Sequence, residues 1–202
     1  NKRDGLGTMK YNNGDSYVGH WKDGLKSGIG KLTYKNGAHY DGDFLNNKQN
    51  GTGTYIYGDK EKYEGEWKDG YFEGHGTYIY INGSRYLGNW LGGLRDGQGS
   101  ITYYSNGSKY NGEWKNDFKN GQGTFVYVNE DIYKGGWEND KMNGDGIFTY
   151  KNGNKYVGNY KEGKRSGKGT FNYSNGDKYF GFFKDGVAKG HGTRTYSDGR
   201  KY

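Results

Sequence analysis

The 23 residues from Tyr63 to Arg85, YEGEWKDGYFEGHGTYIYINGSR, contain the pattern that decides the fold. Numbered from its first tyrosine, this stretch has glycine at positions 3, 8, 12 and 14, tryptophan at position 5 and tyrosine at position 18. The pattern recurs every 23 residues, with one step of 24, and its eight complete copies begin at Tyr17, Tyr40, Tyr63, Tyr86, Tyr110, Tyr133, Tyr156 and Tyr179. A repeat of this length is interpreted before any local structure because it fixes the architecture.

The repeats divide the chain into three parts. Residues 1–16 match the C-terminal half of a preceding repeat, residues 17–201 hold the eight complete repeats, and Tyr202 stands where a truncated ninth repeat would start. We therefore expect the chain to be a segment of a longer repeat protein.

The composition excludes several classes of protein. The 202 residues include 41 glycines and no proline, and the glycines do not recur at every third position, which excludes collagen. No apolar run approaches the roughly 20 residues that cross a bilayer. The absence of cysteine excludes disulfides, thiolate metal sites and cysteine nucleophiles. Disorder is not expected either, because 18% of the residues are aromatic and supply apolar surface that disordered segments lack.

Each repeat has the pattern of a β-hairpin. Positions 1, 3 and 5 alternate with polar residues at period two, and positions 14, 16 and 18 repeat this alternation after a turn. Asn-Gly pairs such as Asn82-Gly83 then provide tight turns between repeats. The expected fold is all-β: an elongated single-layer antiparallel ribbon of stacked 23-residue hairpins. Sixteen strands at about 4.8 Å spacing would form a rod of roughly 80 Å.

The aromatic residues are expected to form structural ladders, because glycines at positions 3 and 14 leave room for rings on the same face. We assign this packing role, and not ligand stacking, to two sets. The first is the tryptophans at position 5, namely Trp21, Trp67, Trp90, Trp114 and Trp137. The second is the invariant tyrosines at position 18, namely Tyr34, Tyr57, Tyr80, Tyr103, Tyr127, Tyr150, Tyr173 and Tyr196.

The motif Tyr-x-Gly-x-Trp-x-x-Gly-x-x-x-Gly-x-Gly resembles the MORN repeat, the membrane occupation and recognition nexus family, over nearly the whole chain. Asn47, Asp117 and Asp140 replace glycine at position 8, and Phe44, Tyr160 and Phe183 replace tryptophan at position 5. The resemblance implies a hairpin ribbon that assembles, or that positions proteins at membranes. In multidomain members such a ribbon accompanies a kinase or methyltransferase domain. An uninterrupted array is most similar to the MORN-only proteins of protist cytoskeletons, which form dimers and larger assemblies at cell-cortex and division structures.

Catalytic chemistry is not expected. The segment from Gly163 to Gly169 lacks the span and the hydroxyl residue of a phosphate-binding loop, and the four histidines fall in separate repeats without an adjacent nucleophile and acid. We expect no enzyme activity, no cofactor and no metal. The one candidate metal ligand is His191, if a two-fold axis duplicated it.

Basic residues are expected in two ladders on the face opposite the rings. One ladder stands just before the repeat tyrosines, at Lys62, Arg85, Lys109, Lys155 and Lys178, and the other follows position 5, at Lys68, Lys115 and Lys161. The simplest interpretation is a solvated face that protects the sheet from edge-to-edge association. The alternative is binding of anionic phospholipid or of an acidic partner. Nucleic acid is not expected, because the rings are committed to packing.

The last repeat departs from the polar pattern of the others. Phe180 and Phe182 occupy positions 2 and 4, where earlier repeats have residues such as Glu64 and Glu66. With Val187 near the turn they would expose an apolar patch, which indicates an interface. We expect a homodimer through this repeat; the alternative is that a further repeat covers these rings.

The sequence thus predicts a non-enzymatic intracellular scaffold of the cytoskeleton or cell cortex, which dimerises near its C-terminal repeat and binds other cytoskeletal proteins. Two alternatives stay open. One is a peripheral phospholipid-binding module that acts through the lysine ladders. The other is an accessory repeat segment of a larger lipid kinase or methyltransferase.

Overall fold

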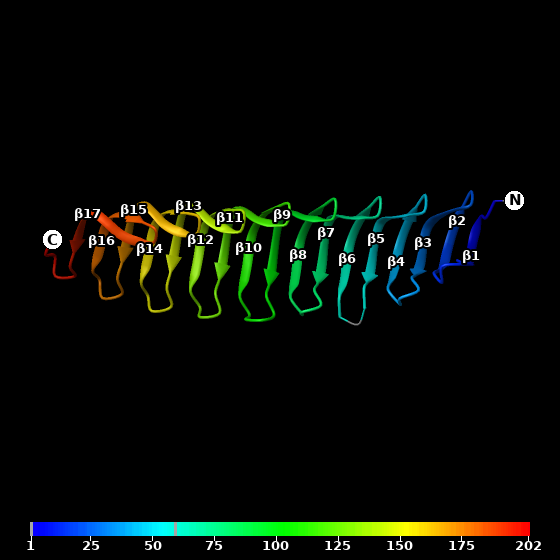
Figure 1. The fold of residues 1–202 in the computed structure, drawn as a ribbon, viewed down its shortest axis with the longest axis horizontal. Helices are drawn as coiled ribbons and strands as arrows, with labels where there is room; N and C mark the ends of the chain where they lie inside the picture. The colour runs from blue at the N-terminus through cyan, green and yellow to red at the C-terminus, as the bar shows by residue number, and fades with distance from the viewer. Residues whose placement is uncertain (1, 59) are drawn as a thin grey trace. The chain divides into compact units, whose positions relative to one another are not determined.

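The computed structural model describes residues 2–58 and 60–202, and every regular element among them is a β-strand. The chain forms two compact units, Asn1–Ser105 and Asn106–Tyr202. Figure 1 labels the strands of both units. The strands of the first unit are β1 (Gly5–Lys10), β2 (Ser16–Lys22), β3 (Leu25–Thr33), β4 (His39–Leu45), β5 (Lys48–Ile56), β6 (Lys62–Lys68), β7 (Tyr71–Ile79), β8 (Arg85–Leu91) and β9 (Leu94–Thr102). Those of the second unit are β10 (Lys109–Lys115), β11 (Phe118–Val126), β12 (Ile132–Glu138), β13 (Lys141–Thr149), β14 (Lys155–Lys161), β15 (Lys164–Asn172), β16 (Lys178–Lys184) and β17 (Val187–Thr195).

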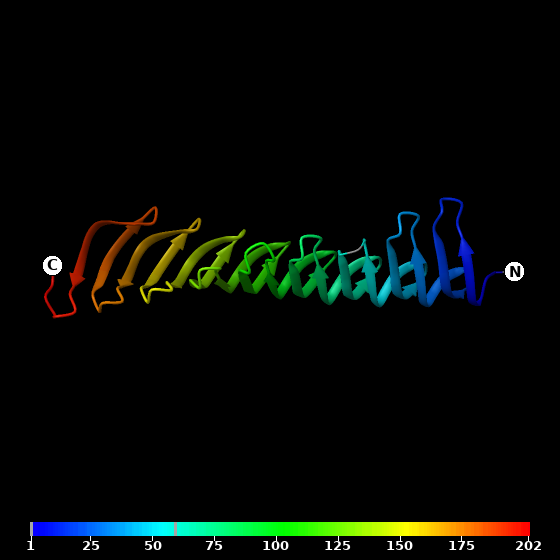
Figure 2. The same cartoon turned by 90° about the horizontal axis from the view of Figure 1, so that it is seen from below.

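Each unit is a single-layer antiparallel sheet whose strands lie side by side in chain order. In the first unit β1 pairs with β2, β2 with β3, and so on to β9. In the second unit the same succession runs from β10 to β17. Figure 2 shows this succession of hairpins within each unit from a second direction. The predicted all-β fold of antiparallel hairpin repeats is confirmed.

Each repeat places a short strand and a longer strand on either side of a two-residue turn. In the third repeat the turn residues Asp69 and Gly70 both have positive φ, 51° and 89°, as a type I′ hairpin turn requires. Asn47, which replaces the turn glycine in the second repeat, has a φ of 72° and so adopts the same left-handed conformation. Asparagine is among the non-glycine residues that tolerate this region best, so the turn is retained without glycine.

A second turn joins each hairpin to the next. Between β7 and β8 the Gly83 amide donates to the Tyr80 carbonyl at 2.8 Å, and the Tyr80 amide donates to the Ser84 carbonyl at 2.9 Å. The Asn82 side chain accepts a hydrogen bond from the Ser84 amide at 2.9 Å. The Asn-Gly pair therefore forms the tight connection that the sequence predicts.

The core of each repeat is a tyrosine ring that lies across two paired glycines. Gly65 on β6 is directly opposite Gly76 on β7, and a Cβ atom added to Gly76 would lie 2.6 Å from carbons of the Tyr63 ring. The Tyr63 hydroxyl donates to the Glu66 carbonyl at 2.9 Å. The glycines therefore leave the space that the tyrosine fills, as expected.

The position-5 rings stand between successive position-1 tyrosines. The Tyr63 ring makes edge-to-face contacts with Trp67, at 5.2 Å between centroids, and with Trp90 of the next repeat, at 5.5 Å. The Trp67 indole also donates to the Gly53 carbonyl of the preceding repeat at 3.0 Å. Seven position-1 tyrosines are completely buried, namely Tyr17, Tyr40, Tyr63, Tyr86, Tyr110, Tyr133 and Tyr156. We call this surface the ring face and the opposite surface the outer face.

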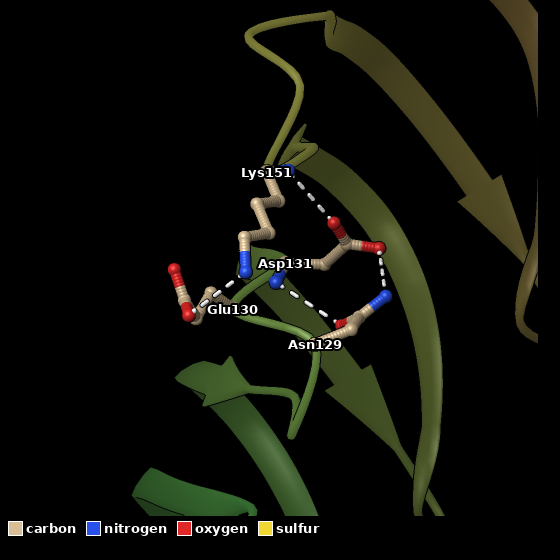
Figure 3. A network of polar contacts seen from close by, with 4 residues as sticks. All are labelled: Asn129, Glu130, Asp131 and Lys151. Atoms are coloured by element: carbon tan, nitrogen blue, oxygen red, sulfur yellow. Dashed lines mark hydrogen bonds and ion pairs between the residues drawn. The ribbon is translucent and has the colours of Figure 1, made fainter.

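Polar contacts at the turns fasten each repeat to its neighbour. In the type I′ turns the Gly70 amide donates to the Gln49 carbonyl at 2.9 Å, and the Asn47 side chain accepts from the Lys26 amide at 2.8 Å. Figure 3 shows the equivalent fastening at the other end of the strands. There the Asp131 carboxylate accepts from the Lys151 amide at 2.8 Å and from the Asn129 side chain at 2.9 Å, and Lys151 also pairs with Glu130.

Candidate protein-interaction surface

The outer face of the early repeats carries acidic side chains that are used within the sheet. At position 4 the Glu66 carboxylate accepts a hydrogen bond from the His75 amide at 2.8 Å, and Asp43 and Glu113 accept from the equivalent amides of their own hairpins. These amides belong to the bulged part of the longer strand, beside a glycine of positive φ. The acidic side chains at position 4 thus satisfy backbone donors that the bulge exposes.

Repeat eight lacks this arrangement and exposes rings in its place. The Phe180 and Phe182 side chains are 55% and 48% exposed on β16. Phe183, the next residue of the same strand, points to the ring face and is buried. Val187 is 61% exposed beside the turn, opposite Lys184. The structure therefore places the three residues predicted for a dimer interface on the surface of one hairpin.

Phe180 is also the last member of an apolar stripe on the outer face. Ile147 on β13 is directly opposite Val157 on β14, Val157 is opposite Thr170 on β15, and Thr170 is opposite Phe180 on β16. Val157 is 39% exposed. Residues opposite one another in adjacent strands form one continuous surface, so the stripe extends over four strands, with apolar side chains on three of them and a threonine on β15.

The predicted lysine ladders are present but interrupted. Position-6 lysines Lys68, Lys115 and Lys161 and the pre-tyrosine residues Arg85, Lys109, Lys155 and Lys178 are exposed, whereas Lys62 is half-buried and pairs with Glu64 at 3.2 Å. In repeat six Ile132 and Glu138 occupy the two ladder positions. Equivalent residues of successive repeats are two strands apart, about 10 Å, so each ladder has a gap of about 20 Å at this repeat.

The two predicted aromatic ladders differ in burial. The position-5 tryptophans are inside the ring face, with Trp21, Trp67, Trp90, Trp114 and Trp137 all buried. The position-18 tyrosines lie just after the longer strands, within the connecting turns, and stay partly exposed: Tyr57 is exposed, and Tyr34, Tyr80, Tyr103, Tyr127, Tyr150, Tyr173 and Tyr196 are half-buried. They therefore pack against the sheet without closing over it.

In the first unit these tyrosines line a hollow on the ring face that sequence reasoning missed. Tyr34, Tyr55 and Tyr57 lie along it, with centroid distances of 5.8 and 4.4 Å between successive rings, and Tyr71 and Phe72 complete its wall. Burial raises the pKa of Tyr55 to about 12. Position 18 follows directly after the longer strand, next to the turn and beyond the last hydrogen bonds between the strands. This placement is the sequence feature that could have indicated the hollow.

Cations on the ring face were also missed. At position 10, Lys26, Lys119 and Arg165 lie over rings of their own and adjacent repeats; the Lys119 ammonium is 4.9 Å from the Trp137 centroid. In repeat eight Arg194 takes the ring's place at position 16, stacks over Tyr173 and pairs with Asp177 at 2.9 Å, which lowers the pKa of that carboxyl. These contacts are cation–π interactions within the fold.

The histidines form no cluster in the part of the chain that the structure describes. His191 is exposed on β17, and no group of three or more His, Asp or Glu side chains among these residues could hold a metal ion. The described residues also include no helix with the length and apolar character needed to cross a membrane.

Comparisons with known proteins address the family and the fold. The MORN repeat model matches residues 1–16, 17–39, 40–62, 63–85, 86–108, 110–132, 133–155, 156–178 and 179–199. No curated protein matches the sequence. Among solved structures, the chain is similar to the wild-type TCP10 domain of Danio rerio CPAP, alone and in complex with a peptide of Danio rerio STIL. The free domain has 13% identity and a TM-score of 0.52, with 96% of this chain and 91% of that chain covered. The complex has 13% identity and a TM-score of 0.55, with 98% and 93% covered. At this identity the likeness concerns the fold alone.

Proposed function

Because the chain belongs to the MORN repeat family, we propose that it is a non-enzymatic scaffold that assembles or positions partner proteins at a cytoskeletal or cortical structure inside the cell. The observation that carries this proposal is the apolar area on repeat eight, on a face that carries acidic side chains in earlier repeats. A solved structure of similar fold contains a peptide of a second protein, which supports protein binding as a use of such a sheet.

We propose further that the first partner is a second copy of the chain, bound through repeat eight. Phe180 and Phe182 lie on one strand, and Val157 and Ile147 extend the same apolar stripe across the outer face. A two-fold axis at this stripe would bring the same residues of two copies together, which is how most homodimers close. Burial of large apolar side chains would supply the driving force.

Molar mass by light scattering tests the dimer. Changing Phe180 and Phe182 together to serine is expected to give a monomer where the parent chain is a dimer. The matched control is Val18→Ser, because Val18 occupies position 2 of the first repeat and is equally exposed, at 55%. This control should leave the mass unchanged. A monomeric parent chain, or a serine double variant that still dimerises, would refute the interface.

Phospholipid binding through the lysine ladders is the second candidate, and the exposure of Lys109, Lys115, Lys155 and Lys161 favours it. Exposed lysines near an anionic membrane each contribute about 1 kcal/mol of attraction. Co-sedimentation with vesicles that contain phosphatidylserine separates the two functions. Lipid binding should weaken with salt and with Lys→Ala changes at these four positions, whereas the dimer mass should stay the same.

A further inference from the structure

The net charge of the chain is carried by the segment from Lys155 to Tyr202, which contains the last two complete repeats. Residues 155–202 contain eleven Lys and Arg residues and four Asp and Glu residues, a formal charge of +7. Residues 1–154 contain nineteen of each kind and are neutral. The long-range attraction of an anionic partner is therefore strongest at repeats seven and eight.

Several of these charges surround a hollow at the turn end of β14, β15 and β16. Lys161, Lys164, Lys184 and Lys189 line it, and Phe182 and Ser166 form part of its wall. We call these six residues the basic hollow. All four lysines are exposed, and Phe182 is 48% exposed. The hollow thus combines convergent positive charge with one accessible ring.

One cross-strand pair in the basic hollow is electrostatically unfavourable. Lys161 is directly opposite Lys164 in its hairpin. In the other hairpins the equivalent pair combines a lysine with an acidic or apolar residue, or two leucines, as in Glu138 with Lys141 and Lys184 with Val187. Like charges directly opposite one another destabilise a sheet, so this pair gains from a bound anion.

The acidic residues beside the basic hollow do not neutralise it. Glu162 lies in the turn between the two lysines, but its carboxylate pairs with Lys141 of the preceding repeat, and this contact lowers the pKa of Glu162. Asp185 is the other carboxylate that lines the hollow. With Lys141 included, five lysines face two carboxylates, which leaves a local excess of positive charge.

The chain itself shows how a carboxylate is held at the corresponding place in other repeats. Asp43, Glu66 and Glu113 at position 4 each accept a hydrogen bond from the amide at position 13 of their hairpin. In repeat eight position 4 is Phe182, which cannot accept this bond, and the amide at position 13 is that of His191. In repeat eight a phenylalanine ring therefore stands at the position where repeats two, three and five have a carboxylate.

We infer that the basic hollow binds an extended acidic segment of a partner protein, one rich in Asp and Glu with an apolar residue that packs on Phe182. Charge complementarity selects the acidic side chains, and the exposed ring selects the apolar one. An extended peptide can place its side chains inside a hollow, whereas a bilayer presents a flat surface to it. The basic hollow shares Phe182 with the proposed dimer surface, but the inference depends on Lys161 and Lys164, which lie outside the apolar stripe, so different variants test the two proposals.

Fluorescence polarisation on the full chain tests the inference, with a labelled peptide of glutamates and one central phenylalanine as the probe. The parent chain should bind it, and affinity should fall steeply as salt is added. Changing Lys161 and Lys164 together to glutamate should weaken binding on the order of tenfold. The matched control changes Lys22 and Lys68 to glutamate, which alters the net charge equally at position 6 of the first and third repeats.

The control variant should keep the parent affinity, and a peptide with glutamine in place of glutamate should not bind. Equal loss in both double variants would show attraction to net charge alone and would overturn the inference. Binding of phosphatidylserine vesicles without binding of the peptide would assign the hollow to a membrane and would also overturn it. Circular dichroism confirms folding of each variant, and light scattering reports the dimer separately, so failure of one proposal is distinguishable from failure of the other.

Discussion

At the scale of the residue, the fold depends on a tyrosine that replaces the missing side chains of two glycines. The Tyr63 ring is completely buried and is held on two sides by Trp67 and Trp90, so it cannot move to admit another atom at Gly76. The same relation recurs in repeat five, where a Cβ atom added to Gly123 would clash with the Tyr110 ring. Each repeat therefore contains a site at which one methyl group is not tolerated.

We predict that Gly76→Ala lowers the free energy of unfolding by about 2–3 kcal/mol, because an added Cβ would overlap the buried ring. Urea denaturation followed by tryptophan fluorescence measures the loss. The matched control is Gly58→Ala, where a Cβ meets no atom within 4 Å, and where the change should stay within about 0.5 kcal/mol. Equal midpoints for the two variants would show that the ring can yield.

Residue by residue, the sequence identifies the buried rings and glycines because they recur at fixed positions with fixed chemistry. The cations over the rings could not be found in this way. Position 10 holds Lys26, Gln49 and Phe72 in the first three repeats, so no residue type marks it as part of the ring face. A lysine is expected in solvent by default, and only the register of the hairpin places Lys119 over Trp137.

At the scale of the element, the hairpin is set by two turns of different kinds. The type I′ turn requires positive φ at both of its central residues, and Asn46 and Asn47 satisfy it with values of 49° and 72°. Asn47 has a second role, because its side chain accepts the Lys26 amide of the preceding repeat. One residue thus fixes the turn and joins two hairpins.

We predict a graded response at Asn47. Asn47→Asp keeps both the turn and the acceptor and should leave stability nearly unchanged. Asn47→Gly keeps the turn and loses the hydrogen bond, at a cost of about 1 kcal/mol that the freer backbone of glycine partly offsets. Asn47→Val loses both and should cost about 2–3 kcal/mol, because a β-branched residue disfavours the left-handed region. Thermal denaturation ranks the three; a valine variant as stable as the aspartate variant would contradict this account.

The elements were predicted well because alternation and Asn-Gly pairs are local signals. The bulge in the longer strand was not predicted, and it limits how far the alternation of apolar and polar residues can assign side chains to a face. In the third repeat the register shifts between Gly65 and Glu66, and two residues of β7, Gly74 and His75, have no direct partner on β6. Alternation counted from one strand cannot be carried across such a shift, so the carboxylate of Glu66 above the bulge was not foreseen.

At the scale of the whole molecule, the tyrosines make both units sensitive to high pH. Burial raises the pKa of Tyr17 to about 12 from an ordinary value of 10.0, and burial also raises the pKa of Tyr133 and Tyr156 in the second unit. Below the ordinary value the folded and unfolded chains are both protonated. Above it the unfolded chain ionises first, so stability falls as the pH rises from about 10 towards 12.

We therefore predict cooperative unfolding in alkali. Tyrosinate absorbance of the buried rings should increase together with the loss of the β-sheet circular dichroism signal, and not before it. The reference is the chain in concentrated urea, whose tyrosines should titrate near the ordinary value. If all tyrosinate absorbance in the native chain appeared while the sheet signal was intact, the buried rings would not control alkaline stability.

At this scale the sequence was sufficient for charge but not for its arrangement. The excess of lysine and arginine after Lys155 can be counted in the printed sequence. That Lys161 lies opposite Lys164, and that both approach Lys184 and Lys189 around one exposed ring, depends on turn length and register. These are set by backbone conformation, which composition does not specify.

The strictly sequential strand pairing has a mechanical consequence. Among the residues that the structure describes, every strand within a unit is hydrogen-bonded only to its neighbours along the chain, and none lies between two segments that are distant in sequence. Tension applied to the backbone acts first on the outermost strand, and the hydrogen bonds of that strand then break one after another. Each unit should therefore lengthen under low force in small steps, one hairpin at a time, and should not unfold in a single step at high force.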